Sequence, residues 1–309
     1  MKISPMAPML FACLVPGTAV AQELATETRV EDVVVVGDTQ RAARAFVDEV
    51  GRAPAGARLA RWNAAPCVGV LGLRSDAAQP INDRVADVAL ALGVEVGEPG
   101  CLPNVIVIFS SEADETAEAL VRRDRDRFRP GIGNSNAGLA ALDRFRTSDA
   151  PVRWWHTSAP VFADSGELAV RYRGGTPPGA DALARGGAAS DSAIRGASRL
   201  RSGVRHDLNS ITIIVDMERV EGVAWPALID YLTMIAMAQI DPEADMSGRD
   251  TILNLFGDDE VVLGLTAWDE AYLTGLYSAD QDSPTARAQE GEIVRRMQDG
   301  RRDAAADGD

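Results

Sequence analysis

The sequence predicts an α/β (α+β) fold in which a mixed sheet is built against a buried central helix. Residues 67–73, 104–109 and 211–215 are short apolar runs rich in Val, Ile or Leu, a pattern typical of buried strands. Residues 225–240 are apolar on nearly every side over the length of a helix, and Pro226 suits its first turn. Because such a helix has no polar face for solvent, we expect it at the centre of the core.

A strand–helix–strand unit opens the predicted sheet. Residues 81–92 lie between the first two strands and have apolar side chains at helical spacing, namely Ile81, Val85, Val88 and Leu92. A helix of this length joins parallel neighbours by a right-handed crossover. The strands at 67–73 and 104–109 are therefore expected to run parallel.

A further helix and an edge strand are expected next. Residues 113–122 predict the helix, and the alternation of Arg with Asp over residues 122–129 indicates its solvated end rather than a nucleic-acid patch. Residues 151–161 are bounded by prolines, which favours an edge strand. Trp154 and Trp155 point to opposite faces of that strand, so we expect one in the core and the other at the surface.

The first residues predict export. Residues 1–21 contain Lys2, a short apolar run at 9–15 and the small residues that precede cleavage after Ala21, as a signal peptide does. The apolar run is too short to span a bilayer. Lipidation of Cys13 is an alternative that bulky Phe11 disfavours. The mature protein is expected in the periplasm or outside the cell.

Charge restricts the class of partner. The formal net charge is −15, and removal of Lys2 with the signal peptide changes it to −16. Such an acidic protein repels nucleic-acid phosphates and anionic lipids. We expect no nucleic-acid partner, no membrane span and no cofactor, and the partner is an unknown envelope protein or ligand.

Two cysteines, Cys67 and Cys101, remain after residue 21. An even pair in an exported protein predicts a disulfide, and the alternative is two unrelated buried thiols. Both lie just before or at the start of the first two predicted strands, where neighbouring parallel strands bring them together.

Residues 22–60 predict an N-terminal appendage made of a strand and a helix. Residues 32–37 resemble a short strand, and residues 39–50 have helical spacing with Ala42, Phe46 and Val50 on one face. A turn-rich stretch at 51–56 follows. The appendage is expected to lie against the main domain.

The main domain is expected at residues 61–280. Residues 174–203 are rich in Gly, Ala and Ser, which predicts a flexible insertion rather than a lid. Residues 281–309 predict a disordered charged tail.

Two segments after the central helix carry a recurring pattern. Residues 250–256 read Asp-Thr-Ile-Leu-Asn-Leu-Phe, and residues 265–277 contain Leu-Thr-Ala-Trp-Asp followed by Leu-Tyr. The first resembles the turn beneath the metal in zincin metallopeptidases of the metzincin group, and the second resembles their last helix. Residues 67–109 and 206–277 are similar to an uncharacterised exported proteobacterial family with a degenerate metzincin-like (zincin) fold.

The resemblance fails at the metal site. A catalytic zincin needs His-Glu-x-x-His on its central helix, because two imidazoles one turn apart bind zinc and the Glu activates water. Residues 230–237 read Asp-Tyr-Leu-Thr-Met-Ile-Ala-Met, and Leu253 replaces the turn methionine. The sequence therefore predicts neither catalytic nor metal-binding residues.

The remaining polar residues are weaker candidates for a cleft. The candidates are Asp230, which lies on the central helix, and Asp216, His156 and His206, which lie in or beside the predicted strands. A structural bond from Asp230 to Tyr231 or an Arg is favoured over catalysis. The two histidines flank strands of one sheet but are too few for a zinc site. Asp241, Glu243, Asp245 and Asp250 lack the Gly and the final Glu of an EF-hand and predict a solvated loop.

Three functions fit these observations. The first is an exported, non-catalytic zincin-like domain with a binding role in the cell envelope. The alternative is an atypical hydrolase that uses carboxylates such as Asp230 and Asp216 in the metzincin-like cleft. The third is a structural envelope protein without a ligand.

Overall fold

The computed structural model describes residues 28–51, 53–54, 57–128, 135–169, 201–257 and 262–306. Two compact units divide the chain between Asp38 and Thr39, and the sheet lies in the second. The predicted signal peptide lies outside the described residues, and so does the insertion at 174–203 apart from its last three residues.

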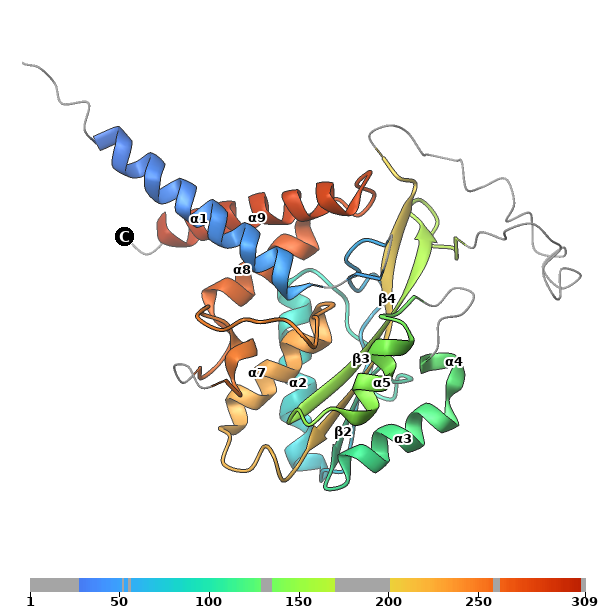
Figure 1. The fold of residues 1–309 in the computed structure, drawn as a ribbon. Coiled ribbons are helices and arrows are strands. Elements are labelled where there is room, and N and C mark those ends of the chain that lie inside the picture. Colours follow the sequence, from blue (N-terminus) through green and yellow to red (C-terminus); the bar gives the residue numbers. More distant parts are fainter. Residues whose placement is uncertain are drawn as a thin grey trace, which may run out of the picture. The chain divides into compact units, whose positions relative to one another are not determined.

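Helices and strands alternate along the first half of the described chain, and helices dominate the end (Figure 1). In order they are α1 (Thr28–Val50), β1 (Val68–Leu71), α2 (Ser75–Ala91), β2 (Val105–Ser110), α3 (Ala113–Arg123), α4 (Arg125–Phe128), α5 (Leu139–Thr147), β3 (Val152–Phe162), β4 (Val204–Asp216), α7 (Trp225–Met237), the 3-10 turn η2 (Ile252–Asn254), α8 (Ala267–Ser278) and α9 (Ala286–Ala306).

The four strands form one mixed sheet in the order β1-β2-β4-β3. β1 pairs with β2 and β2 with β4 in parallel, whereas β3 pairs with β4 antiparallel and lies at the edge of the sheet. The predicted α+β class, the parallel crossover and the edge position of residues 151–161 are thereby confirmed.

Helices cover both faces of the sheet (Figure 1). On one face α2 and α7 contact β2, β3 and β4 through the main core, with Val107, Ile213 and Leu232 at its centre. On the other face α3, α4 and α5 form a second cluster around Trp155 and Ile214. α7 is buried all round, as its sequence predicts, and Leu232 and Ile235 have no exposed surface.

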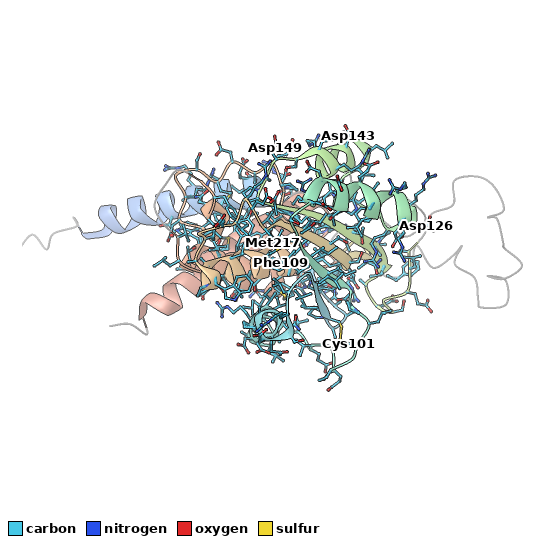
Figure 2. The ribbon with its side chains drawn as sticks, turned by 90° about the horizontal axis from the view of Figure 1, so that it is seen from below. Cys101, Phe109, Asp126, Asp143, Asp149 and Met217 are labelled. Atoms are coloured by element: carbon cyan, nitrogen blue, oxygen red, sulfur yellow. A yellow bond between two sulfur atoms is a disulfide. The ribbon has the colours of Figure 1, made fainter. Side chains whose placement is uncertain are left out.

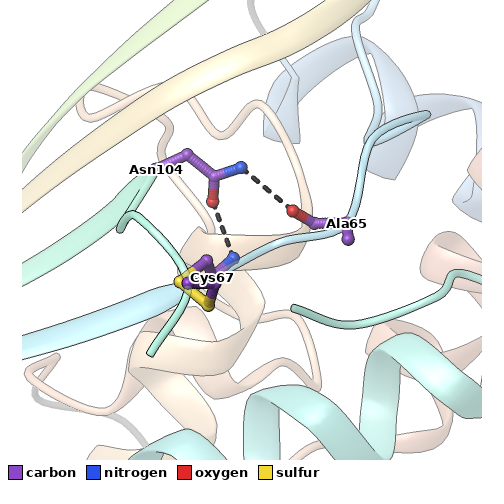
Figure 3. Close-up of a disulfide and its surroundings, with 4 residues drawn as sticks. Ala65, Cys67 and Asn104 are labelled. Atoms are coloured by element: carbon purple, nitrogen blue, oxygen red, sulfur yellow. Dashed lines mark hydrogen bonds between the residues drawn. A yellow bond between two sulfur atoms is a disulfide. The ribbon is translucent and has the colours of Figure 1, made fainter. Parts of the chain in front are cut away.

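Cys67 and Cys101 form the predicted disulfide, with Cα atoms 6.2 Å apart. Asn104 braces the same corner, because its side chain accepts from the Cys67 N–H at 2.7 Å and donates to the Ala65 carbonyl at 3.0 Å (Figure 3). Gly97 lies against the bridge, where an added Cβ would come within 2.5 Å of the Cys101 sulfur. The bridge therefore fixes the starts of β1 and β2.

The strand predicted at residues 32–37 is wrong, because these residues lie inside α1. Valines favour strands only weakly, and a single Gly37 costs a helix about 1 kcal/mol, which does not end it. Within 39–50 the buried face carries Ala43, Phe46, Val47 and Val50, and Ala42 is exposed.

Residues 39–60 of the expected appendage lie in the second compact unit. This unit also contains the sheet, and Phe46, Leu59 and Ala60 are buried in its core. The main chain of Leu59 exchanges two hydrogen bonds with the side chain of Gln289, at 2.9 and 3.0 Å. The segment is thereby attached to the C-terminal helix.

The disordered tail expected at 281–309 is replaced up to Ala306 by α9. Ile293, Val294 and Met297 form a narrow apolar stripe that is buried against the core. Because charged residues are frequent around this stripe, the composition of the segment did not indicate a packed helix. Gly275 of α8 permits the contact, since an added Cβ would come within 2.9 Å of the Ile293 carbonyl.

Both tryptophans of β3 are buried, so the expectation that one lies at the surface is wrong. Trp154 enters the main core, and Trp155 packs with Phe128 and Phe145 on the opposite face. The layer of α3, α4 and α5 supplies the second apolar environment.

The outer side of this layer is exposed and carries charged side chains of both signs. Asp126, Asp143 and Asp149 point outward in Figure 2, which also shows Phe109 and Met217 near the carboxyl ends of β2 and β4. No helix in the described ranges is both long enough and apolar enough to cross a bilayer.

Reduction of the Cys67–Cys101 bridge should lower the melting temperature. The bridge joins residues 34 positions apart, and a loop of this length contributes about 3–4 kcal/mol by restricting the unfolded chain. We expect a decrease of roughly 5–10 °C on adding reductant, measured by calorimetry.

The Cys67→Ala/Cys101→Ala double variant is the control. It should melt at the lower temperature whether reductant is present or not. If thiol titration of the unfolded, unreduced protein finds both cysteines free, the proposed role of the bridge is wrong.

Candidate functional site

The helix that would carry the metal in a zincin is here the centre of the core. Between Tyr231 and Met237 every residue of α7 is buried. Thr233 donates its hydroxyl to the carbonyl of Ile229 one turn earlier, at 2.8 Å. This stretch therefore has no His, Cys, Asp or Glu side chain that could bind a metal ion.

The end of α7 is capped by side chains from three distant segments. The last carbonyls of a helix lack partners within the helix. The Ile235 carbonyl accepts from His156 Nε2 at 2.9 Å, the Ala236 carbonyl from Trp62 Nε1 at 2.8 Å and the Met237 carbonyl from the Tyr277 hydroxyl at 2.8 Å. Burial of this helix end depends on these three donors.

Asp230 has structural partners, and the expected bond to an Arg is confirmed. Its Oδ1 is 2.5 Å from Arg84 Nε on α2, and its Oδ2 accepts from the Leu265 N–H at 2.9 Å. An added Cβ on Gly264 would come within 2.7 Å of Asp230 Oδ2. Asp230 therefore ties α2, α7 and the entrance to α8 together, and Tyr231 is not its partner.

Asp216 closes the turn after β4. Its Oδ1 accepts from the N–H groups of Glu218 and Arg219 at 3.1 and 3.3 Å, and its Oδ2 is 3.2 Å from Arg219 Nε. The two carboxylates of the hydrolase alternative thus have separate partners, Arg84 and Arg219.

The two histidines belong to the same strand pair but have different surroundings. His156 lies opposite Ile211, and His206 lies opposite Pro160. His206 Nδ1 accepts from the Arg58 N–H at 3.5 Å. Across the described residues, no three His, Cys, Asp or Glu side chains gather as a group that could hold a metal ion.

Burial lowers the pKa of both histidines to about 4. At His156 the carbonyls of Ile235 and Ala238 oppose that effect. At His206 the charge of Arg58 adds to burial, and Asp207 opposes it. Both imidazoles are neutral at pH 7, which suits His156 to its role as a donor.

The motif at residues 265–277 has a structural role. Asp269 is fully buried, and it accepts from Thr251 Oγ1 at 2.5 Å, from Ile252 N at 2.7 Å and from Thr266 N at 2.9 Å. Burial raises the pKa of Asp269, and these bonds oppose the rise. The carboxylate joins η2 to the capping box that starts α8.

A cavity of about 250 Å³ lies at the free edge of β3. We call it the β3-edge cavity. Its walls are mostly apolar and come from α5, from β3, from α7 and from the loops that follow α7 and η2. Among its lining residues are Ala141, Phe145, Trp154, His156, Tyr231, Gln239, Ile240 and Phe256. Of the four predicted cleft residues it includes only His156.

The register of β3 shows which backbone groups face this cavity. Asp216 donates to the Pro151 carbonyl at 2.9 Å, one position before the Val152–Val215 pair. Bonding alternates along an antiparallel pair, so Val152, Trp154 and His156 direct their N–H and C=O groups away from β4. The N–H of Ile211, which lies opposite His156, donates to the Asn104 carbonyl on the β2 side at 2.8 Å, as this alternation requires.

Part of the free edge is covered. Ser135 exchanges two backbone hydrogen bonds with Ser158, at 2.7 and 2.8 Å. In the part of the chain that the structure describes, no segment pairs in this way with Val152, Trp154 or His156. The uncovered edge therefore coincides with the β3-edge cavity.

Two buried side chains of the cavity keep unused hydrogen-bonding capacity. Tyr231 is 6% exposed, and its hydroxyl has no hydrogen-bond partner among the described residues. Gln239 is 4% exposed; its Oε1 accepts from the Ala60 N–H at 3.1 Å, which leaves Nε2 without a partner in the described ranges. Neither atom is among those sealed from solvent, unlike the Tyr272 hydroxyl.

An ion pair closes the outer side of the cavity. Arg144 Nη2 on α5 is 2.8 Å from Glu243 Oε2 in the loop after α7. α5 lies on the face of the sheet that carries the Trp155 cluster. The loop after α7 lies on the opposite face, where Trp154 Nε1 donates to the Ile240 carbonyl at 3.0 Å. Because β4 occupies the other edge of β3, the Arg144–Glu243 pair passes over the free edge.

Sequence reasoning missed this site. Tyr231 and Gln239 are polar residues on or just after the apolar helix, but the opposite wall of the cavity comes from α5, about 90 positions earlier, so no local pattern joins the two. No family model matches the chain, and neither a curated protein nor a solved structure is significantly similar to it.

Removal of the His156 imidazole should flatten the dependence of stability on pH. The folded pKa of about 4 is below the unfolded value of about 6.5, so the unfolded state binds the proton first. The contribution of the neutral His156 imidazole to the free energy of unfolding is complete above pH 6.5 and is lost as the pH falls towards 4. His156→Gln keeps an N–H donor for the Ile235 carbonyl but does not titrate.

Urea unfolding at pH 7.5 and 4.5 measures this effect. Between pH 7.5 and 4.5 the free energy of unfolding of the native protein should fall by about 2 kcal/mol more than that of His156→Gln. Equal losses would show that the imidazole is not held neutral. His206 and the carboxylates titrate in both proteins, and their contribution cancels in the comparison.

Proposed function

We propose that this protein is an exported, non-catalytic binding protein with a degenerate zincin-like fold, and that its ligand occupies the β3-edge cavity. The observation that carries the proposal is the cavity itself. Its apolar walls, its uncovered strand edge and its two unused polar groups are the usual features of a small-molecule site.

The non-catalytic assignment rests on residues 230–237. They contain neither the two His nor the Glu that the zincin mechanism needs. Leu232 and Ile235 are instead part of the core, and the carbonyl end of the helix accepts from Trp62, His156 and Tyr277. The polar interior of an enzyme of this class is thus replaced by packing.

Export is supported by the signal-like residues 1–21 and by the disulfide. A bridge between Cys67 and Cys101 is stable in an oxidising compartment such as the periplasm. The acidic composition fits a protein that does not bind nucleic acid or anionic lipid.

The hydrolase alternative receives less support. A carboxylate that acts as a general base has to reach the substrate. Asp230 is held by Arg84 and Leu265, and Asp216 by Arg219 and its own turn. Neither residue lines the β3-edge cavity.

Filling the cavity should abolish binding. Ala141 lines the cavity from α5, whereas Ala140 on the same helix is exposed and does not line it. Native protein and Ala140→Trp isolated from the periplasm should release a small molecule in roughly stoichiometric amount on solvent extraction and mass spectrometry. Ala141→Trp should release none.

Three results would overturn the proposal. The first is release of the same amount from Ala141→Trp, and the second is release of nothing from the native protein. The third is one zinc ion per chain that is lost when His156 or His206 is replaced by Ala, because that result would restore a metal site.

A further inference from the structure

We infer that the β3-edge cavity selects a small, uncharged molecule that has an aromatic or apolar body and one carbonyl-type oxygen. The inference rests on the proposed function, because both concern the same cavity. It adds the chemical class of the ligand, which follows from size, lining, hydrogen-bonding capacity and charge.

Size and lining define the body of the ligand. An apolar cavity of about 150 Å³ holds a benzene ring, so 250 Å³ accommodates roughly ten non-hydrogen atoms by proportion. Trp154 and Phe256 each meet the ring of Tyr231 edge-on, with centroids 6.3 and 5.0 Å apart. These rings favour an aromatic or branched apolar group.

The unused hydrogen-bonding groups define the polar atom. Gln239 Nε2 only donates, and the Ala60 N–H fixes its orientation by donating to Oε1. The Tyr231 hydroxyl can donate as well. Two donors in an apolar cavity call for an acceptor, and a carbonyl oxygen has two lone pairs with which to accept from both.

The charges exclude an ionised ligand. Arg153 is 3% exposed; its Nη2 is 2.6 Å from Asp114, its Nη1 donates to the Arg146 carbonyl at 3.3 Å, and its Nε is sealed from solvent. Arg144 at the mouth is paired with Glu243. A buried carboxylate would therefore lack a cation. A buried ammonium would lack an available carboxylate, because Glu243 is paired with Arg144 and Asp241 Oδ1 accepts from the Glu243 N–H at 3.1 Å.

The ion pair over the strand edge favours a compact ligand over an extended peptide. A peptide strand added to β3 would have to run along Val152, Trp154 and His156, across the line from Arg144 to Glu243. Both side chains of the pair are 47% exposed. Such a pair opens at little cost, so a small molecule can enter and the pair can close again.

Matched probes test the inference. We would titrate the native protein with 3-phenylpropanamide, 3-phenylpropanoate, 3-phenylpropylamine and propylbenzene, following the indole N–H resonances of Trp154 and Trp155 by NMR. Fragments of this size bind in roughly the millimolar range. The neutral amide should bind at least about tenfold more tightly than either ion.

Tyr231→Phe separates the hydrogen bond from the apolar contact. It removes only the hydroxyl, so affinity for the amide should fall about fivefold while affinity for propylbenzene stays unchanged. Tighter binding of the carboxylate or the amine, or an unchanged amide affinity in Tyr231→Phe, would overturn the inference but leave the proposed function in place.

Two further outcomes complete the test. If acetyl-Val-Thr-Val-Thr-amide binds more tightly than the amide, and more tightly still in Glu243→Gln, the ligand is an added strand and the inference is wrong. If no probe shifts either indole and the native protein carries no extractable molecule, the proposed function fails together with the inference.

Discussion

The last turn of α7 is the constraint on which the rest of this structure depends. A helix that ends inside a core leaves carbonyls without partners, and an unsatisfied buried carbonyl costs about 1–3 kcal/mol. Here Trp62, His156 and Tyr277 each donate to a different carbonyl of that turn. The N-terminal segment, the edge strand and the last part of the chain are thereby all anchored to one helix end.

This arrangement accounts for the neighbouring elements. Arg61 next to Trp62 donates to the carbonyls of Leu276 and Ala279 at 2.6 and 3.0 Å, so the same segment also caps α8. Asp230 near the start of α7 bonds to Arg84 of α2. The central helix is held at both ends by polar contacts while its length is apolar.

The β3-edge cavity lies where this packing stops. Trp154 donates to Ile240, and Gln239 accepts from Ala60, so the chain immediately after α7 is also fixed. Tyr231 and Gln239 are buried residues that line this cavity, and each keeps one polar group unused. A rigid wall with unsatisfied donors is the arrangement that a selective binding site requires.

Local patterns predicted the parts of the fold that depend on neighbouring residues. The strands at 68–71 and 105–110, the helix between them and the disulfide follow from periodicity and from two cysteines. The motif that resembles a zincin ending also lies where its residues cap a helix, at Asp269 and Tyr277. No comparison with a known protein tests the resemblance itself.

The parts of the structure that the sequence did not predict each have a physical reason. Residues 32–37 resemble a strand because valines favour strands, but the helix that continues to Val50 includes them. α9 has no wide apolar face, because a narrow stripe of Ile293, Val294 and Met297 is enough to pack one side of it against the core. The cavity combines residues from Ala137 to Phe256, and its site residues are set by tertiary contact, which leaves no periodic signal.

Two buried tyrosines test the central claim most directly. The Tyr277 hydroxyl donates to the Met237 carbonyl at 2.8 Å, whereas the Tyr231 hydroxyl has no hydrogen-bond partner in the described chain. We expect Tyr277→Phe to lower the free energy of unfolding by about 1–3 kcal/mol, and Tyr231→Phe to change it by less than about 0.5 kcal/mol. Equal losses, or a larger loss for Tyr231→Phe, would contradict both the capping of α7 and the open position of Tyr231.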